Sequence, residues 1–352
     1  MTEVPNGMFA GCSALTSITL PNSIITINQY AFSGCSSLSE ITLSSYIKTI
    51  GTYAFNKSGL IRVVLPEGLT SLGDYAFNEC PNLQSAKIPS TLKNIPNYAF
   101  YKNNYLCVVE FATGVKTIGR YAFGYCPSLK NLVLPDGLTT VDSNAFYDNS
   151  GIESIVIPRS LTTVGSYAFY SLDALKNIYY KGSVADWCNI SFANYSTNPL
   201  YEGENFYVLG NNGQYELVTE LVIPEGVTTI NDYAFYGMPN ITSVVLPSTL
   251  KTVGKSAFYG LPASGSVYYN SSIANWLNIS FENSDANPIT RARKFYLLNA
   301  NNEYELLTNL VIPEGTTELS TYAFVSVNCG YINKNYTILY HKNRMVIFNE
   351  NS

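Results

Sequence analysis

The stretch LKNLVLPDGLTTVDSNAF, residues 129–146, is the unit from which most of this chain is built. Variants of it recur along the 352 residues, and the Phe residues that close successive copies lie 22 or 23 residues apart. They are Phe9, Phe32, Phe55, Phe77, Phe100, Phe123, Phe146 and Phe169. A constant period of this length predicts a solenoid in which each copy forms one coil.

Each copy reads L-x-x-I-x-L-P, then a short polar step, then L-x-x-I-G-x-Y-A-F. The first half alternates like a strand with one buried face, and the Pro ends the strand because it has no N–H to donate. In Y-A-F the small Ala lets coils approach and the Phe adds apolar bulk, which predicts a single helical or 3₁₀ turn. One copy buries too little apolar surface to offset its ordering entropy, so the coils must stack, about 4.8 Å apart.

This pattern, with C often three residues after Y-A-F, resembles the BspA-like leucine-rich repeat family over nearly the whole chain. The resemblance implies an α/β solenoid: a right-handed superhelix with a parallel sheet of short strands and short helical turns after each Y-A-F. Members are mostly surface or secreted proteins of gut and oral bacteria, with some in parasitic protists, and several are implicated in adhesion to host proteins. The resemblance therefore implies an extracellular or cell-surface protein that binds other molecules.

The period breaks after Phe169, because the next closing residues are Phe235, Phe258 and Phe324, at steps of 66, 23 and 66. Both long intervals align without a gap at an offset of 89 residues. The second half of the chain therefore contains two duplicated insert modules.

These observations predict one continuous leucine-rich repeat solenoid over residues 1–326. Regular repeats fill 1–170, and the long units span about 170–235 and 259–324. Residues 327–352 are expected to form a C-terminal cap, with a closing hairpin at 336–340 and 345–348, or a disordered tail.

Within the inserts, Ser183 and Ser272 are placed as N-caps of short helices. Trp187 and Trp276 follow at helical spacing with apolar neighbours, which favours a local core. The alternative is that their indole faces stack on carbohydrate rings. An Asn-Pro turn comes next, and residues 211–213, Asn-Asn-Gly, predict a hairpin turn.

The composition excludes several classes of partner. The net charge is −5 with only 20 Lys and Arg, which are scattered as single residues apart from Arg291–Lys294, so no basic stripe is present to bind nucleic acid. No apolar run approaches the roughly 18 residues that span a bilayer, and we predict no transmembrane segment. The sequence has no secretory signal, and Met1 enters part-way through a repeat, so we expect a piece of a longer protein whose leader and anchor lie outside it.

Four of the seven Cys residues, Cys12, Cys35, Cys80 and Cys126, occupy one repeat position. We interpret them as a row of small buried thiols. A bridge between Cys12 and Cys35, on adjacent coils, stays open as an alternative. No C-x-x-C spacing indicates a zinc or redox site.

The only histidine is His341, which excludes histidine-based triads and multi-histidine metal sites within the chain. No nucleotide-binding or hydrolase motif appears. Two pairs of carboxylates could act as the acids of a glycosidase, Glu202 with Glu204 and Asp136 with Asp148, but only their negative charge makes them candidates. We predict a protein that is not an enzyme and that has no metal site and no cofactor.

The residue between Ile and Leu in L-x-x-I-x-L points away from the core on each strand. That row becomes apolar towards the C-terminal half: Thr19, Thr42, Val64, Lys87, Glu110, Val133, Val156, Tyr179, Val222, Val245, Tyr268 and Val311. We predict that Val133, Val156 and Tyr179, flanked by Lys87 and Glu110, bind a ligand. Strand propensity alone would select the same residue types.

Two functions fit the sequence. One is an extracellular or cell-surface binding module, whose sheet face and insert loops engage an unknown protein or glycan, with host molecules among the candidates. The alternative is a passive spacer or scaffold in a larger surface protein. A contiguous, distinctive exposed patch favours the first, and a uniformly polar, repetitive surface favours the second.

Overall fold

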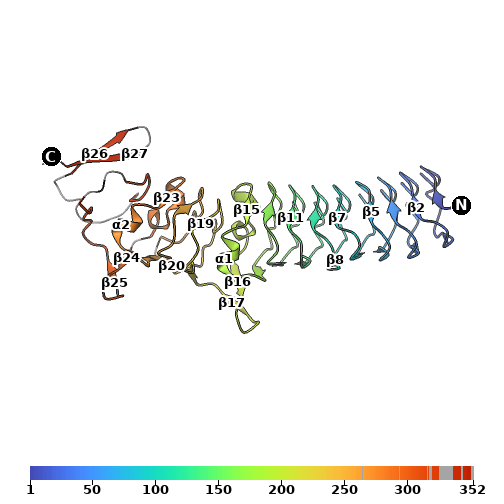
Figure 1. Cartoon of the computed structure of the whole chain (residues 1–352). Coiled ribbons are helices and arrows are strands. Elements are labelled where there is room, and N and C mark those ends of the chain that lie inside the picture. The colour runs from blue at the N-terminus through green and yellow to red at the C-terminus, as the bar shows by residue number, and fades with distance from the viewer. Residues whose placement is uncertain are drawn as a thin grey trace. The chain divides into compact units, whose positions relative to one another are not determined.

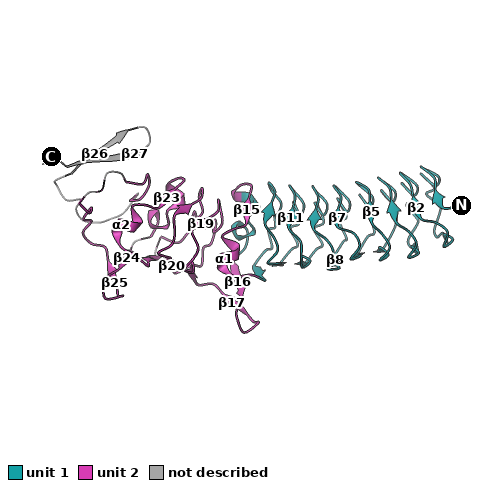
Figure 2. Cartoon of the chain, viewed as in Figure 1, with its two compact units in different colours: residues 1–181, 196–203 teal, residues 182–195, 204–352 magenta. Residues whose placement is uncertain are grey.

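Each regular repeat forms one coil, and most coils contribute short strands to two parallel sheets (Figure 1). The computed structural model describes residues 1–263, 265–292, 294–314, 316 and 319–324, and the backbone of 336–341 and 344–349. The chain folds into two compact units. Unit 1 comprises residues 1–181 and 196–203, and unit 2 comprises residues 182–195 and 204–352 (Figure 2). The predicted solenoid is confirmed as a parallel-strand β-solenoid with few helices. A single continuous body over residues 1–326 stays a prediction.

In unit 1, the two-residue strands that follow the polar step pair in register, with Thr26 opposite Thr49 and Ile27 opposite Ile50. They form two runs: β1 (Glu3–Val4), β2 (Thr26–Ile27), β3 (Thr49–Ile50) and β5 (Ser71–Leu72), then β7 (Asn94–Ile95), β9 (Thr117–Ile118), β11 (Thr140–Val141) and β13 (Thr163–Val164). The L-x-x-I-x-L segments form β4 (Arg62–Val64), β6 (Ser85–Ile88) and β8 (Val108–Phe111), then β10 (Asn131–Val133), β12 (Ser154–Ile157) and β14 (Asn177–Tyr180).

Unit 2 repeats this arrangement around the inserts. Its larger sheet contains the parallel strands β18 (Glu220–Val222), β20 (Ser243–Leu246), β22 (Ser266–Tyr269) and β24 (Lys294–Leu298), with β25 (Tyr304–Leu306) antiparallel to β24. The second sheet contains β19 (Thr229–Ile230), β21 (Thr252–Val253) and β23 (Ser280–Phe281). The unit also holds β15 (Ser191–Phe192) and the hairpin of β16 (Asn205–Leu209) and β17 (Tyr215–Leu217).

A column of Phe rings forms the centre of unit 1. The closing Phe residues from Phe32 to Phe169 have no exposed surface. Consecutive rings from Phe9 to Phe169 lie 5.1–5.7 Å apart and within 12° of parallel. Stacking at this distance adds to the burial of each ring, so every coil is stabilised by the coils on either side of it.

The Y-A-F segment is not a helical turn, and that prediction is wrong. Its Tyr lies in the left-handed region, with φ of 56° at Tyr98 and 52° at Tyr121. The chain instead turns so that most of the closing Phe N–H groups donate to the Ala carbonyl of the next coil, at 2.8 Å from Phe100 to Ala122, whereas the Phe258 N–H donates to the Asp285 carbonyl at 3.2 Å. Backbone hydrogen bonds between coils take the place of the hydrogen bonds that a helix would form along itself, because each neighbouring coil presents a backbone carbonyl at the equivalent position.

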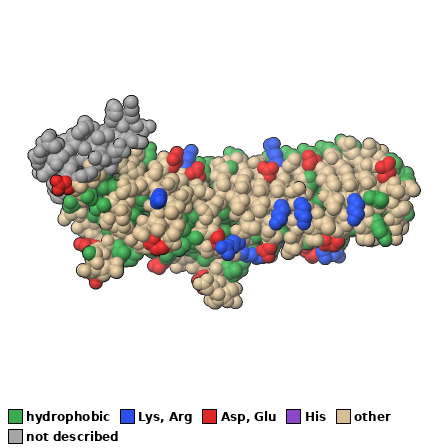
Figure 3. All heavy atoms as spheres, viewed as in Figure 1, with side chains coloured by type: hydrophobic (Ala, Val, Ile, Leu, Met, Phe, Trp, Pro, Cys, Tyr) green, Lys and Arg blue, Asp and Glu red, His purple; other side chains and the backbone are tan. Residues whose placement is uncertain are grey.

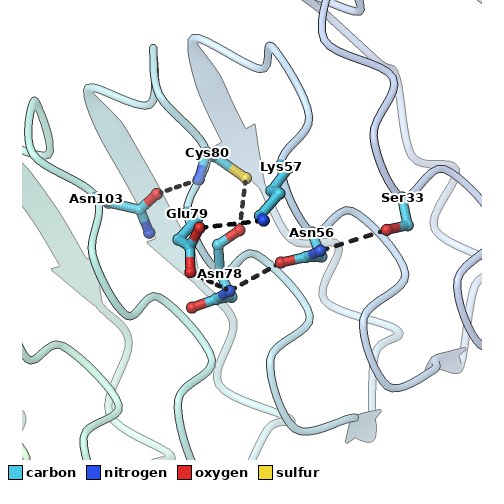
Figure 4. A network of polar contacts seen from close by, with 7 residues as sticks. All are labelled: Ser33, Asn56, Lys57, Asn78, Glu79, Cys80 and Asn103. Carbon is cyan, nitrogen blue, oxygen red and sulfur yellow. Dashed lines mark hydrogen bonds and ion pairs between the residues drawn. The ribbon is translucent and has the colours of Figure 1, made fainter. Parts of the chain in front are cut away.

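A row of polar side chains runs beside the Phe column, at the position where the sequence has Cys. The Sγ of Cys80 donates to the Phe55 carbonyl at 3.2 Å, and the Nδ2 of Asn103 donates to the Phe77 carbonyl at 2.9 Å. The Oδ1 of Asn103 also accepts the N–H of Cys80 at 2.9 Å (Figure 4). Each of these side chains therefore satisfies a buried backbone group of an earlier coil.

The cysteine predictions are mostly confirmed. Cys35, Cys80 and Cys126 are buried, and burial raises the pKa of the Cys80 thiol to about 11. Cys12 is exposed, contrary to prediction. Cys12 and Cys35 are free thiols, so the alternative of a bridge between them is wrong. Cys329 lies outside the described residues.

A second polar row lies nearer to the solvent. The Nδ2 of Asn78 donates to Asn56 at 2.8 Å, and the Nδ2 of Asn56 donates to the Oγ of Ser33 at 3.3 Å (Figure 4). Lys57 forms an ion pair of 3.5 Å with Glu79 in the same region. These contacts join neighbouring coils at equivalent positions, as repetition of the coil requires.

The two inserts contain the described helices, α1 (Val184–Trp187) and α2 (Ile273–Trp276). Ser183 and Ser272 are their N-caps, as predicted; Ser183 forms a capping box with Asp186, whereas the Ser272 side chain makes no capping bond. The Asn-Pro turns open the 3₁₀ helices η2 (Pro199–Tyr201) and η4 (Pro288–Thr290); η1 (Tyr195–Thr197) and η3 (Ser284–Ala286) precede them. The predicted hairpin turn is confirmed, with Gly213 at a φ of 77°.

At the C-terminal end, β26 (Tyr336–His341) and β27 (Arg344–Asn349) pair in antiparallel fashion, which confirms the predicted hairpin. That residues 327–352 form a cap stays a prediction. Within the described part of the chain, no helix has the length and hydrophobicity needed to cross a bilayer.

Candidate binding surface

The predicted ligand-binding residues Val133, Val156 and Tyr179 form one line across three strands. They lie in register on β10, β12 and β14, with Val133 opposite Val156 and Val156 opposite Tyr179. Val133 is 51% exposed, and Val156 and Tyr179 are partly exposed, while the residues before them, Leu132, Ile155 and Ile178, are buried. We call Val133, Val156 and Tyr179 the apolar strip. Alternation along each strand turns these side chains away from the core.

The flanking residues Lys87 and Glu110 occupy the same position on β6 and β8. They are opposite each other in register and exposed, with no ion pair between them. The run of strands β4, β6 and β8 ends there, and β10 begins the next run. The structure thus divides the predicted site into a charged part and an apolar part.

Ion pairs border the apolar strip at both ends of its strands. At the start of β10, Lys130 contacts Glu153 at 3.1 Å, and beyond its end Asp136 contacts Lys181 at 2.8 Å. Beside the strip, the Oγ of Ser154 donates to the Oδ1 of Asn131 at 2.7 Å. The arrangement is an apolar centre with a polar rim, which is typical of protein interaction surfaces.

Three of the four carboxylates considered for catalysis, Asp136, Asp148 and Glu202, make structural contacts, and Glu204 is exposed. Asp136 is held by Lys181, and Asp148 accepts a bond of 3.4 Å from the Oγ of Ser171. Glu202 accepts the N–H of Ser171 at 3.2 Å; burial raises the pKa of its carboxyl, the charge of Asp173 adds to this, and the Ser171 N–H opposes it. No group of three or more potential metal ligands occurs among the described residues.

The two tryptophans belong to the core, as the helical spacing favoured. Trp187 and Trp276 are completely buried, and their Nε1–H groups donate to the Ala234 carbonyl at 2.6 Å and to the Ala323 carbonyl at 2.9 Å. Neither indole presents a face to a sugar ring. Each instead ties its helix to the Y-A-F segment of a later coil.

The sequence did not reveal a second surface of unit 1, formed by tyrosines after the strands. Tyr98 and Tyr121 stack at 5.1 Å, and Tyr101 and Tyr125 meet edge to face at 5.4 Å. The Nζ of Lys102 lies 5.3 Å from the centre of the Tyr101 ring. Burial first, and then the neighbouring tyrosines, raise the pKa of Tyr101 to about 12. The signal was the occurrence of Tyr at three positions of the repeat, two residues before the closing Phe and one or two residues after it, but the contact between these rings depends on the left-handed turn.

The duplicated inserts also differ in charge at one equivalent position. Glu202 of the first insert and Arg291 of the second are equivalent at the offset of 89 residues. Glu202 binds the Ser171 N–H, whereas the guanidinium of Arg291 lies 4.8 Å from the centre of the Tyr259 ring. The charge reversal therefore matches a different local contact in each insert.

On the face that Figure 3 shows, charged side chains lie in small scattered groups within an uncharged surface. This agrees with the composition, in which charged residues are 13% of the chain. A surface of this kind favours recognition by shape and apolar contact over attraction by a strong field.

Several solved structures of repeat proteins are similar to this chain. A leucine-rich repeat protein from Bacteroides ovatus is 22% identical, with 80% of this chain and 87% of that chain covered and a TM-score of 0.48. A leucine rich cell surface protein from Faecalibacterium prausnitzii is 25% identical over 53% of this chain and 65% of that chain, with a TM-score of 0.31. The pneumococcal vaccine antigen PcpA is 18% identical, with 81% of this chain and 74% of that chain covered and a TM-score of 0.35.

No curated protein matches the sequence. The family model of the BspA type leucine rich repeat region, in contrast, matches in six copies, over residues 2–108, 93–213 and 214–333. The matched segments contain both the regular repeats and the two inserts. The chain therefore belongs to the BspA-type leucine-rich repeat family.

Proposed function

We propose that this chain is a non-enzymatic, extracellular or cell-surface binding module that recognises a protein or glycan through the sheet face of unit 1. The apolar strip is its centre, and Lys87 and Glu110 extend it; the insert loops are proposed as further binding surfaces of their own. Its location outside the cell is part of the proposal and is supported by membership of the family.

One observation carries the proposal: the apolar strip is contiguous and exposed. Val133 exposes half of its surface although buried positions adjoin it on the same strand. Strand propensity explains a Val or Tyr at each position, but it does not explain two ion pairs at the borders of the strip. Exposed apolar residues inside a polar rim are the arrangement in which a few central side chains supply most of the binding energy.

The test is the double variant V156S/Y179S. Because both side chains are partly exposed, the variant should melt within a few degrees of the wild-type chain. Binding should be measured against immobilised extracellular-matrix proteins and an array of glycans. We expect the double variant to lose at least about tenfold in affinity for any molecule that the wild-type chain binds, since a single central contact contributes roughly 1.4 kcal/mol or more.

Val64→Ser is the matched control, because Val64 is 46% exposed at the same repeat position on β4, outside the strip. It should leave binding unchanged. A large fall in melting temperature of the double variant would show that the strip is core. Equal binding by the wild-type chain and the double variant would instead support the passive spacer or scaffold.

A further inference from the structure

The larger sheet of unit 2 has an outward face made of two rows, one apolar and one polar. The apolar row contains one residue from each parallel strand, in register: Val222, Val245, Tyr268 and Tyr296. The polar row lies two residues earlier on the same strands: Glu220, Ser243, Ser266 and Lys294. Since successive residues of a strand alternate between faces, both rows lie on the outward face and the residues between them point inward. Within the polar row Glu220 and Lys294 are exposed, Ser266 is partly exposed and Ser243 is buried.

The apolar row is exposed and rigid. Val222 is 48% exposed, and Val245, Tyr268 and Tyr296 are partly exposed. Tyr268 stacks on Tyr296 at 4.7 Å and meets Tyr304 of β25 edge to face at 4.9 Å. The hydroxyl of Tyr304 donates to Asn270, which in turn donates to Glu225 at 3.1 Å. A surface that is already ordered loses little conformational entropy when it binds.

The polar row carries opposite charges at its two ends. Glu220 and Lys294 are both exposed, and neither forms an ion pair with another described residue. They lie three strands apart, on the order of 14 Å at the usual strand spacing. The side chains of the apolar row also differ in size between its two ends. Two Val residues lie on the side of Glu220, and two larger Tyr residues lie on the side of Lys294.

We propose that this face binds the same face of a second copy of the chain, about a two-fold axis parallel to the strands. That axis reverses the strand order, so β18 of one copy faces β24 of the other and β20 faces β22. Each Glu220 then meets the Lys294 of the other copy, and each Val meets a Tyr. A two-fold interface must be self-complementary, and both rows meet that condition in charge and in size.

A two-fold axis perpendicular to the strands, in the plane between the sheets, does not give this match. It keeps the strand order and places the polar row of one copy over the apolar row of the other. Glu220 would face Val222, and its carboxylate would lose water without gaining a partner. With the axis parallel to the strands, each large Tyr instead lies opposite a smaller Val, which suits two sheets about 10 Å apart.

The experiment measures the sedimentation of the full chain over a range of concentrations. The wild-type chain should form a dimer. Glu220→Lys alone, or Lys294→Glu alone, places like charges opposite each other at two symmetry-related positions, and each should raise the dimer dissociation constant by about tenfold or more. The double variant E220K/K294E restores opposite charges with their places exchanged, and it should recover most of the wild-type affinity.

Glu40→Lys is the matched control, because it makes the same charge change at an exposed position of unit 1 and should leave the dimer unchanged. Circular dichroism should confirm that every variant is folded, and added salt should weaken the wild-type dimer. Two outcomes overturn the proposal. One is a wild-type chain that stays monomeric at all concentrations, which leaves the face to a different partner. The other is a double variant that is weaker than either single variant.

Discussion

Phe123 shows how one side chain of the repeat joins three coils. Its ring is completely buried, 5.1 Å from the ring of Phe100 and 5.6 Å from that of Phe146. Its N–H donates to the Ala145 carbonyl at 2.8 Å, and its own carbonyl accepts from the Nδ2 of Asn149 at 2.9 Å. The ring and the backbone of this residue therefore stabilise the same stack.

We predict that Phe123→Ala lowers the free energy of unfolding by about 3–5 kcal/mol, from lost burial and the cavity that remains. Because the coils support one another, amide hydrogen exchange should quicken in the neighbouring coils as well. Val133→Ala, at an exposed position, is the control and should change stability by less than about 1 kcal/mol. Faster exchange in a single coil would contradict the coupling of neighbours.

At the same scale, the sequence predicted the burial of Cys80 and Cys126 but not the role of the residues around them. Asn103 and Asn149 occupy the same repeat position as these Cys residues and, like them, donate to the closing Phe carbonyl of the preceding coil, although an amide and a thiol look unrelated in a sequence. The position selects a small side chain that donates a hydrogen bond. Only the close approach of the Phe carbonyl reveals that requirement.

Among the elements, the insert helices illustrate how a short helix is held in place. Four residues are too few for a stable isolated helix, so α1 and α2 depend on contacts outside themselves. Trp187 and Trp276 supply them, packing at 4.8 Å on Phe206 and at 4.5 Å on Phe295. Each indole N–H then reaches the Ala carbonyl of a Y-A-F segment 47 residues later.

We predict that Trp276→Phe lowers the free energy of unfolding by about 1–3 kcal/mol, because the variant keeps an aromatic ring but loses the buried hydrogen bond. Denaturant unfolding followed by circular dichroism measures this change. In the wild-type chain, tryptophan emission should lie well to the blue of that of the unfolded chain and should not respond to added glycans. Emission typical of a solvated indole would contradict the buried position of both tryptophans.

In the turns of the Y-A-F segments, packing between coils overrides the local backbone preference of the Tyr residue. A left-handed conformation costs an L-residue roughly 1–2 kcal/mol, and yet the Tyr of most Y-A-F segments adopts it. Ring stacking between coils and the bond from the Tyr98 N–H to the Arg120 carbonyl, at 2.8 Å, offset that cost. Local propensity takes no account of ring stacking or hydrogen bonds between coils. For that reason the sequence predicted a helical turn, which is wrong.

At the scale of a whole unit, the tyrosine surface makes stability depend on pH. The pKa of Tyr101 rises from 10 to about 12 on folding, chiefly through burial. Burial likewise raises the pKa of the Cys126 thiol to about 12. A folded-state pKa above the unfolded value means that the folded chain holds these protons more tightly. Their contribution to stability is thus complete below the unfolded pKa and is lost as the pH rises through 12.

We therefore predict that the free energy of unfolding falls between pH 9, where the Cys126 thiol begins to titrate in the unfolded chain, and pH 12, and that Tyr101→Phe makes the fall above pH 10 less steep. Urea unfolding at a series of pH values measures it. Tyr105→Phe removes an exposed phenol outside this group of tyrosines and is the matched control. A slope that Tyr101→Phe leaves unaltered would show that the ring does not titrate as its surroundings require.

For the molecule as a whole, the sequence alone determined the solenoid, its coil length, the inserts and the outward row of the sheet. It did so because a repeated alternation of apolar residues allows only one way to bury them, by stacking equal coils. The tertiary structure decided which outward residues form surfaces. The row of unit 2 continues onto β24 through Tyr296, which no repeat pattern marks, because the second insert returns the chain to the edge of the same sheet. Likewise the ion pair of Asp136 with Lys181, 45 residues and two coils apart, arises because stacking brings these two segments to about 10 Å from each other, a distance that the Lys side chain spans. Pairing between strands sets that spacing, and no stretch of sequence contains it.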